Sequence, residues 1–120
     1  MGLYKQTICV RHDLKMRMGK VAAQVGHSCV MSVLPIESIN CPLRILRWIE
    51  EGMTKIVVKV ESEDELLSIV EKAKKCGIAT HLVTDAGHTE FHGVPTKTCA
   101  AIGPDLCEKI DQLTGDLKLL

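Results

Sequence analysis

Two short segments of the sequence concentrate the side chains that could do chemistry. The first spans residues 12–20 and ends at Lys20, where an apolar helical pattern begins. The second spans residues 85–98 and starts with one carboxylate, Asp85, which follows a β-rich run and precedes histidines, hydroxyls and glycines. Because open α/β sheets place their sites at the ends of strands, both segments are candidates for parts of one site.

Three polar side chains extend the first segment along the apolar helix. Lys20, Gln24 and His27 follow one another at i, i+4 and i, i+3 spacing, so all three can line one helix face. Buried polar groups need partners, and Gln24 and His27 could equally satisfy buried backbone groups. Lys20 favours a binding site, because the helix dipole disfavours a cation at the first turn and favours an anion that the lysine could bind.

The second segment also fits an ordinary hairpin, in which Asp and Thr side chains make only local turn hydrogen bonds. Its histidines, His88 and His92, and the nearby His81 have no carboxylate at a spacing that suits a metal, so we expect no metal site. The six cysteines form no CxxC pair and fit no zinc template. The sequence contains no G-x-S-x-G motif, so it gives no indication of a serine nucleophile.

The elements that must position these segments alternate between strand and helix patterns. Strands are predicted over residues 6–11, 53–60, 78–84 and 98–102, the last ending at Gly103-Pro104. Helices are predicted over residues 20–34 with a stop at Pro35, from an Asn40 cap to Gly52, from a Ser62 capping box to Gly77, and over about 105–113. Crossover helices between strands predict an α/β fold, a three-layer α/β/α sandwich with a mixed four-stranded sheet, as a single domain over residues 1–120.

The overall composition excludes several classes of protein. A hydrophobic fraction of 46% and a charged fraction of 25% are typical of a globular chain and not of a disordered one. No apolar run approaches the roughly 20 residues needed to span a bilayer. With neither a leader nor a disulfide framework in view, we expect a cytoplasmic protein with reduced thiols.

The balanced net charge hides an asymmetry between the two halves of the chain. Residues 1–60 carry nine cations against four anions, and residues 61–120 carry six cations against eleven anions. The basic half predicts a basic face around the site, with Lys15, Arg17, Lys20, Arg44 and Arg47 as its members. Only three aromatic residues are present, too few for base-stacking platforms, so nucleic-acid contacts should be mainly to phosphates.

Five blocks in the same order along the chain resemble the second, archaeal and eukaryotic-type, family of peptidyl-tRNA hydrolases. They are residues 13–27 with DLKM and GKVAAQVGH, residues 48–60, DAGHTE at 85–90, AIGP at 101–104 and TGDLKLL at 114–120. The chain departs from the family pattern at Ser28, where Ala is usual, and at His88, where Arg is frequent. The stretch 91–96 is about one residue longer than the usual turn, which leaves open whether Thr96 or Thr98 is the site threonine; alignment backwards from Gly103-Pro104 favours Thr98.

The resemblance implies a homodimeric, cofactor-independent hydrolase that cleaves the ester between a peptide and the terminal ribose of tRNA. Its catalytic residues would be Lys20, Asp85, Thr89 and Thr98, with Gln24 and His27 nearby for substrate binding. Lys15, Arg17, Arg44 and Arg47 would contact the acceptor stem and the CCA end. Ester hydrolysis needs an oriented water and oxyanion stabilisation. Asp85 would orient the water, and Lys20 would either stabilise the oxyanion or clamp the terminal phosphate.

Two other functions fit parts of the sequence. A non-catalytic tRNA- or protein-binding module would use the same scaffold, but the joint presence of Lys20, Asp85 and Thr89 argues against it. A small-metabolite regulatory sheet domain would explain the architecture but not the motifs.

The apolar character of residues 25–34 exceeds what one helix packing on one sheet face needs, which predicts a homodimer interface. For the thiols, we expect Cys9, Cys29 and Cys99 to be buried, and Cys41 and Cys107 to be the better candidates for exposure.

Overall fold

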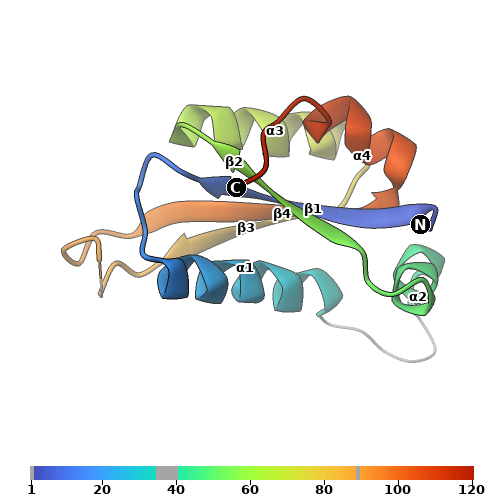
Figure 1. Cartoon of the computed structure of the whole chain (residues 1–120), viewed down its shortest axis with the longest axis horizontal. Coiled ribbons are helices and arrows are strands. Elements are labelled where there is room, and N and C mark those ends of the chain that lie inside the picture. Colours follow the sequence, from blue (N-terminus) through green and yellow to red (C-terminus); the bar gives the residue numbers. More distant parts are fainter. Residues whose placement is uncertain (1, 35–40, 89) are drawn as a thin grey trace.

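The computed structural model describes residues 2–34, 41–88 and 90–120, and it forms the α/β fold that the sequence predicts (Figure 1). Eight elements follow one another along the chain: β1 (Tyr4–Arg11), α1 (Met18–Val33), α2 (Leu43–Glu50), β2 (Lys55–Val60), α3 (Glu63–Lys75), β3 (Thr80–Asp85), β4 (Thr96–Leu106) and α4 (Cys107–Thr114). The expected stop at Pro35 and cap at Asn40 lie outside the described residues. Among the described helices, none is both long and apolar enough to cross a membrane.

The four strands form one mixed sheet in the order β2-β1-β4-β3. β1 pairs with β2 in parallel, and β4 runs antiparallel to both β1 and β3. β1 and β3 therefore run in the same direction on either side of β4 (Figure 1), so their last residues, Arg11 and Asp85, lie at the same end of the sheet.

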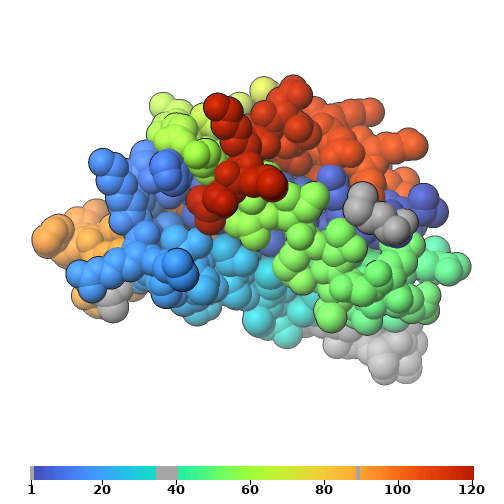
Figure 2. Space-filling model, viewed as in Figure 1, coloured from blue at the N-terminus to red at the C-terminus, as the bar shows by residue number. Residues whose placement is uncertain are grey.

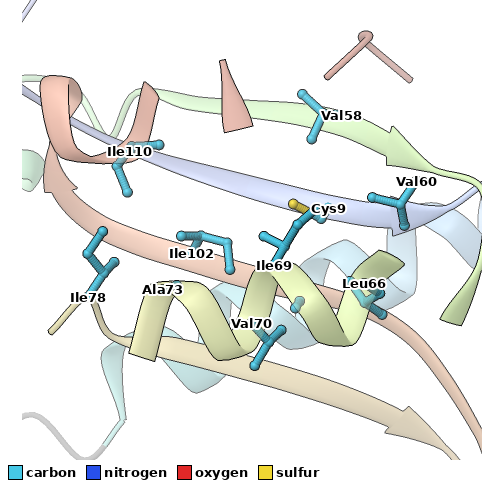
Figure 3. Close-up of a cluster of buried hydrophobic side chains, with 11 residues drawn as sticks. Cys9, Val58, Val60, Leu66, Ile69, Val70, Ala73, Ile78, Ile102 and Ile110 are labelled. Carbon is cyan, nitrogen blue, oxygen red and sulfur yellow. The ribbon is translucent and has the colours of Figure 1, made fainter. Parts of the chain in front are cut away.

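Helices cover both faces of this sheet (Figure 1). α3 and α4 lie on one face, over a core formed by Val58, Leu66, Ile102, Ile110 and their neighbours (Figure 3). α1 lies on the other face, where Val21 and Val25 pack against Ile8, Val10 and Ala101 of the sheet, and α2 follows on the same side. The predicted three-layer architecture is therefore confirmed.

Local sequence signals explain some boundaries and fail at others. Ser62 Oγ accepts a hydrogen bond from the Glu65 N–H at 3.0 Å, as the capping box predicts. The expected end of a strand at Gly103-Pro104 is wrong, because β4 continues to Leu106. A register shift in the β1–β4 pairing takes up these residues, and a bulge is one place where a sheet tolerates proline. The last helix consequently begins at Cys107 instead of near Asp105.

The thiols follow the sequence expectation only in part. Cys9 and Cys99 are buried, as expected, and all six cysteines are free. The expectation for Cys29 is wrong, because this residue is only half-buried on the flank of α1. Cys41 and Cys107 are also half-buried, and Cys76, at the end of α3, is the exposed thiol.

Candidate active site

The candidate site lies where α1 begins and β3 ends, at one end of the sheet (Figure 1). Asp85 closes β3 and pairs with Thr96, the first residue of β4. Lys20 lies in the first turn of α1 and reaches across to this strand end. The fold therefore joins the two polar segments that stand 65 residues apart in the sequence.

Asp85 is held by three donors from two parts of the chain. Its Oδ1 accepts hydrogen bonds from Lys20 Nζ at 2.9 Å and from Gln24 Nε2 at 3.2 Å. Its Oδ2 accepts the backbone N–H of Gly87 at 2.8 Å. The side chains of Lys20 and Asp85 are only 13% and 16% exposed, so the ion pair is largely shielded from water.

These donors determine the charge state of Asp85. The hydrogen bond from Lys20 is the main cause that lowers the pKa of Asp85 below its ordinary value. Burial acts in the opposite direction, while the Gly87 N–H, the charge of Lys20 and the amide of Gln24 reinforce the lowering. Asp85 is therefore a carboxylate at neutral pH, able to accept hydrogen bonds from a water molecule.

Thr98 enters the network through Gln24. Its Oγ1 donates to Gln24 Oε1 at 2.6 Å, and both side chains are buried, with relative exposures of 0% for Thr98 and 1% for Gln24. A register shift between β3 and β4 pairs Val83 with Cys99 and Thr84 with Lys97, which leaves Thr98 unpaired. Bulges of this kind re-aim a side chain, and here the bulged threonine contacts α1.

Glycine is required at position 87 by the backbone conformation and by the lack of room for a side chain. Its φ is +85°, in the left-handed region, and a Cβ at this position would overlap the backbone of Val94. The Gly87 carbonyl also accepts the Gly93 N–H at 2.8 Å, which closes the loop after β3. This role of Gly87 is not among the sequence predictions, although an Asp followed two residues later by Gly is a turn signal.

Two further residues that the sequence analysis did not single out lie beside the pair. The ring of Phe91 lies 5.7 Å from Lys20 Nζ, within the range of a cation–π contact. Glu90 faces the exposed Arg17, with 3.9 Å between the Glu90 Oε1 and Arg17 Nε atoms. No sequence signal indicates either contact, because both depend on where residues 90 and 91 lie against the start of α1.

Not all predicted site residues gather here. His27 lies on the same helix, about one turn beyond Gln24, where it is exposed and lines a hollow with Val83 and Thr84 of β3. Thr96 makes a local hydrogen bond to the Val94 carbonyl at 2.8 Å. Thr89 lies outside the described residues.

The predicted cations separate into two groups. Lys15 and Arg17 are exposed on the loop that leads into α1, the helix whose first turn carries Lys20. Arg44 and Arg47 lie on α2, and Arg44 Nη1 donates to the carbonyl of Pro104 at 3.3 Å. Since Asp85 pairs with Thr96 and β4 runs eight residues from there to Pro104, Arg44 contacts the strand about 25 Å from the site.

A hollow beside the start of α1 is lined by residues of β1, the 12–16 loop and the first turn of α1. It has a volume of about 490 Å³ and an apolar wall formed by Val10, Met16, Val21 and their neighbours, with Lys15 and His12 at its rim. Its lining includes neither Lys20 nor Asp85, so the ion pair lies outside this hollow. Elsewhere in the described chain, no three His, Cys, Asp or Glu side chains gather as metal ligands would.

The chain is similar to known peptidyl-tRNA hydrolases over nearly its whole length. The family model described as "Peptidyl-tRNA hydrolase PTH2" matches residues 4–120. A peptidyl-tRNA hydrolase of Methanothermobacter thermautotrophicus is 50% identical over 116 residues, which cover 97% of this chain and 99% of the relative. One from Methanopyrus kandleri is 45% identical over 118 residues, covering 98% and 99% of the two chains. The family match over nearly the whole chain and these identities show that the chain belongs to the PTH2 family of peptidyl-tRNA hydrolases.

Proposed function

We propose that this chain hydrolyses the ester bond between tRNA and the peptide, or N-blocked amino acid, that it carries, and so recycles peptidyl-tRNA dropped from ribosomes. The observation that carries the proposal is the Lys20–Asp85 pair, which is largely buried and joins the two polar segments of the sequence, residues 12–20 and 85–98. Membership of the family supports the same substrate.

In the proposed reaction, Asp85 orients a water molecule against the ester carbonyl. The water oxygen bonds to the carbonyl carbon, the carbonyl oxygen becomes an oxyanion, and a proton of the water passes to the carboxylate. When the tetrahedral intermediate collapses, the bond between carbon and ribose oxygen breaks, and that oxygen takes the proton back from Asp85. The low pKa of Asp85 suits a group that orients water and carries the proton only briefly.

Lys20 is proposed to stabilise the oxyanion. Its ammonium group is largely buried and lies 2.9 Å from Asp85, so an ester attacked by a water on Asp85 would lie within its reach. A preorganised cation in such a site acts on charge that develops during the reaction. A clamp on the terminal phosphate is the alternative role, and it would show itself in substrate affinity and not in turnover. Thr89 is proposed as a further catalytic residue from the family motif alone.

The basic residues are proposed to bind tRNA in two places. Lys15 and Arg17 are next to the site and would contact the phosphates of the CCA end. Arg44 and Arg47, at the far end of β4, would meet phosphates further along the acceptor stem. Their separation supports contact with an extended substrate instead of one continuous basic patch.

The outer surface of α1 supports a homodimer. Val30 on α1 and Leu34 directly after it are 55% and 62% exposed, and Leu43 and Ile49 of α2 are 62% and 45% exposed. The space-filling view shows the surfaces of α1 and α2 along the same side of the molecule (Figure 2). Apolar side chains gathered on one face mark interaction surfaces. We expect two copies of the chain near micromolar concentration by sedimentation, and weaker association for Val30→Glu. We also place the protein in the cytoplasm, where its proposed substrate arises.

The proposed function is tested with purified protein treated with a chelator and supplied with N-acetylated aminoacyl-tRNA. We expect release of free tRNA by the native protein and a loss of at least about 10²-fold with Asp85→Asn. Binding of tRNA without hydrolysis would contradict the enzyme and support a non-catalytic binding module.

A further inference from the structure

We propose that Gln24 and Thr98 are positioning residues that act on the reaction through Asp85: Thr98 fixes the orientation of the Gln24 amide, and this amide occupies Asp85 Oδ1, so that Oδ2 is the carboxylate oxygen that receives the attacking water. This inference rests on the proposed function. It assigns no substrate contact to either residue.

The direction of each hydrogen bond follows from the chemistry of the groups. A carboxylate can only accept, so the amide group that faces Asp85 must be the NH₂ of Gln24. The Gln24 carbonyl oxygen then faces Thr98, and because a carbonyl can only accept, the threonine hydroxyl must be the donor. The hydroxyl proton of Thr98 is thereby committed to Gln24.

The same accounting separates the two oxygens of Asp85. Each carboxylate oxygen offers two lone-pair sites. Oδ1 accepts from Lys20 and Gln24, which fills both sites, whereas Oδ2 accepts only the Gly87 N–H among the described residues. Oδ2 therefore keeps one acceptor site, and a water bound there would lie on a carboxylate whose orientation is fixed by donors at both ends.

Burial excludes direct contact between these two side chains and a tRNA. Thr98 has no exposed surface and Gln24 has a relative exposure of 1%. Cys99 holds the backbone beside them, since its thiol donates to the main-chain carbonyl oxygen of Gln24 at 3.4 Å, and burial raises the pKa of this thiol to about 11, so it keeps the proton that it donates. The β4 bulge turns two consecutive residues, Thr98 and Cys99, toward α1, and both contact Gln24.

The test compares Thr98→Val, which keeps the shape but removes the donor, with Thr98→Ser, which keeps the donor. We expect Thr98→Val to lower kcat by about ten- to a hundredfold with KM unchanged, because a small displacement of a reacting group can cost this much. Thr98→Ser should stay within about threefold of the native kcat. The matched control is Thr7→Val, which removes a threonine hydroxyl that is also buried but lies against Thr114 of α4.

Two measurements separate positioning from a merely structural role. In the Gln24→Met/Thr98→Val double variant, kcat should be no lower than in Gln24→Met alone, because Thr98 acts only through the amide. The pKa of Asp85, followed by carbon NMR of its carboxyl group, should rise in both Gln24→Met and Thr98→Val, whereas Thr7→Val should leave it unchanged.

The outcomes distinguish this inference from the proposed function. Additive losses in kcat, a change in KM alone, or an unchanged pKa of Asp85 in folded Thr98→Val would overturn the positioning role. If the native protein released no tRNA, the proposed function would fail, and the NMR titration would still decide whether Thr98 controls Asp85 through Gln24. If Thr98→Val did not fold, the titration of Gln24→Met and the rescue by Thr98→Ser would decide it.

Discussion

Replacing Lys20 with Met removes one charge from the candidate site and keeps most of the length of the side chain. The Lys20 ammonium lies 2.9 Å from Asp85 Oδ1, and neither side chain exceeds 16% exposure. The substitution therefore leaves a largely buried carboxylate with only Gln24 and Gly87 as donors. We expect the pKa of Asp85 to rise, because the hydrogen bond from Lys20, the main cause that lowers it, is lost.

Loss of this ion pair should lower both the thermal stability of the protein and its kcat. Breaking a fully buried ion pair costs about 3–5 kcal/mol, and the two remaining donors and the partial exposure reduce this to about 1–2 kcal/mol. For 120 residues, an unfolding entropy of about 0.25 kcal/mol/K makes this a Tm decrease of about 4–8 °C. The loss in kcat should be larger, about 10²–10³-fold, as for other preorganised electrostatic groups.

The assay is release of tRNA from N-acetylated aminoacyl-tRNA, with Tm measured on the same samples. Lys5→Met is the matched control, because Lys5 also pairs with a carboxylate, Asp111, and its side chain is 12% exposed, but it lies at the start of β1, away from the site. We expect Lys5→Met to lower Tm without lowering kcat. A Lys20→Met protein that keeps kcat within threefold of the native value, or an equal loss of kcat in Lys5→Met, would refute the reasoning.

Four further predictions follow from the same geometry. The pKa of Asp85 is lower in the folded than in the unfolded state, so its contribution to stability is present above about pH 4 and is lost as the pH falls through the folded pKa. In chemical denaturation, the difference in unfolding free energy between the native protein and Asp85→Asn should therefore be constant near neutral pH and shrink at lower pH. A difference that does not depend on pH would contradict this prediction. Gly87→Ala places a Cβ against Val94 and strains a left-handed residue, so kcat should fall by at least about tenfold, and native-like kinetics would show that the loop is not needed. KM should rise with salt, with a slope that becomes shallower by about 1 in Arg17→Ala but not in Lys74→Ala, an exposed lysine on the opposite layer; equal slopes would remove Arg17 from tRNA binding. Cys76 should be the first thiol labelled in the native state and Cys9 the last, because burial raises the pKa of the Cys9 thiol to about 12; early labelling of Cys9 would contradict the packing of β1.

The architecture could be predicted from the sequence because local signals agree with the tertiary structure over most of the chain. The Ser62 cap, the apolar pattern of α1 and the alternation in β2 each point to the element that forms. The failures arise where pairing overrides a local signal. Gly103-Pro104 is a strong stop signal by itself, but β4 is held on both sides by β1 and β3 and absorbs it in an irregular register.

The candidate site could be predicted in part for the same reason. Lys20, Gln24 and Asp85 stand at a helix start and a strand end, positions that the fold class brings together. The contact of Thr98 with Gln24 depends on a bulge in β4, and neither the residue types nor their spacing in the sequence predict that bulge. The separation of Arg44 from the site was equally inaccessible, because net charge per segment carries no information on where α2 packs.

The most direct test of the central claim is single-turnover hydrolysis of N-acetylated aminoacyl-tRNA in water enriched in oxygen-18, with both products analysed by mass spectrometry. Water held on Asp85 attacks the carbonyl carbon, so one heavy oxygen should appear in the released acyl carboxylate and none in the tRNA. The rate should fall by at least about 10²-fold in Asp85→Asn. Heavy oxygen in the terminal ribose, or an undiminished rate in Asp85→Asn, would contradict the account.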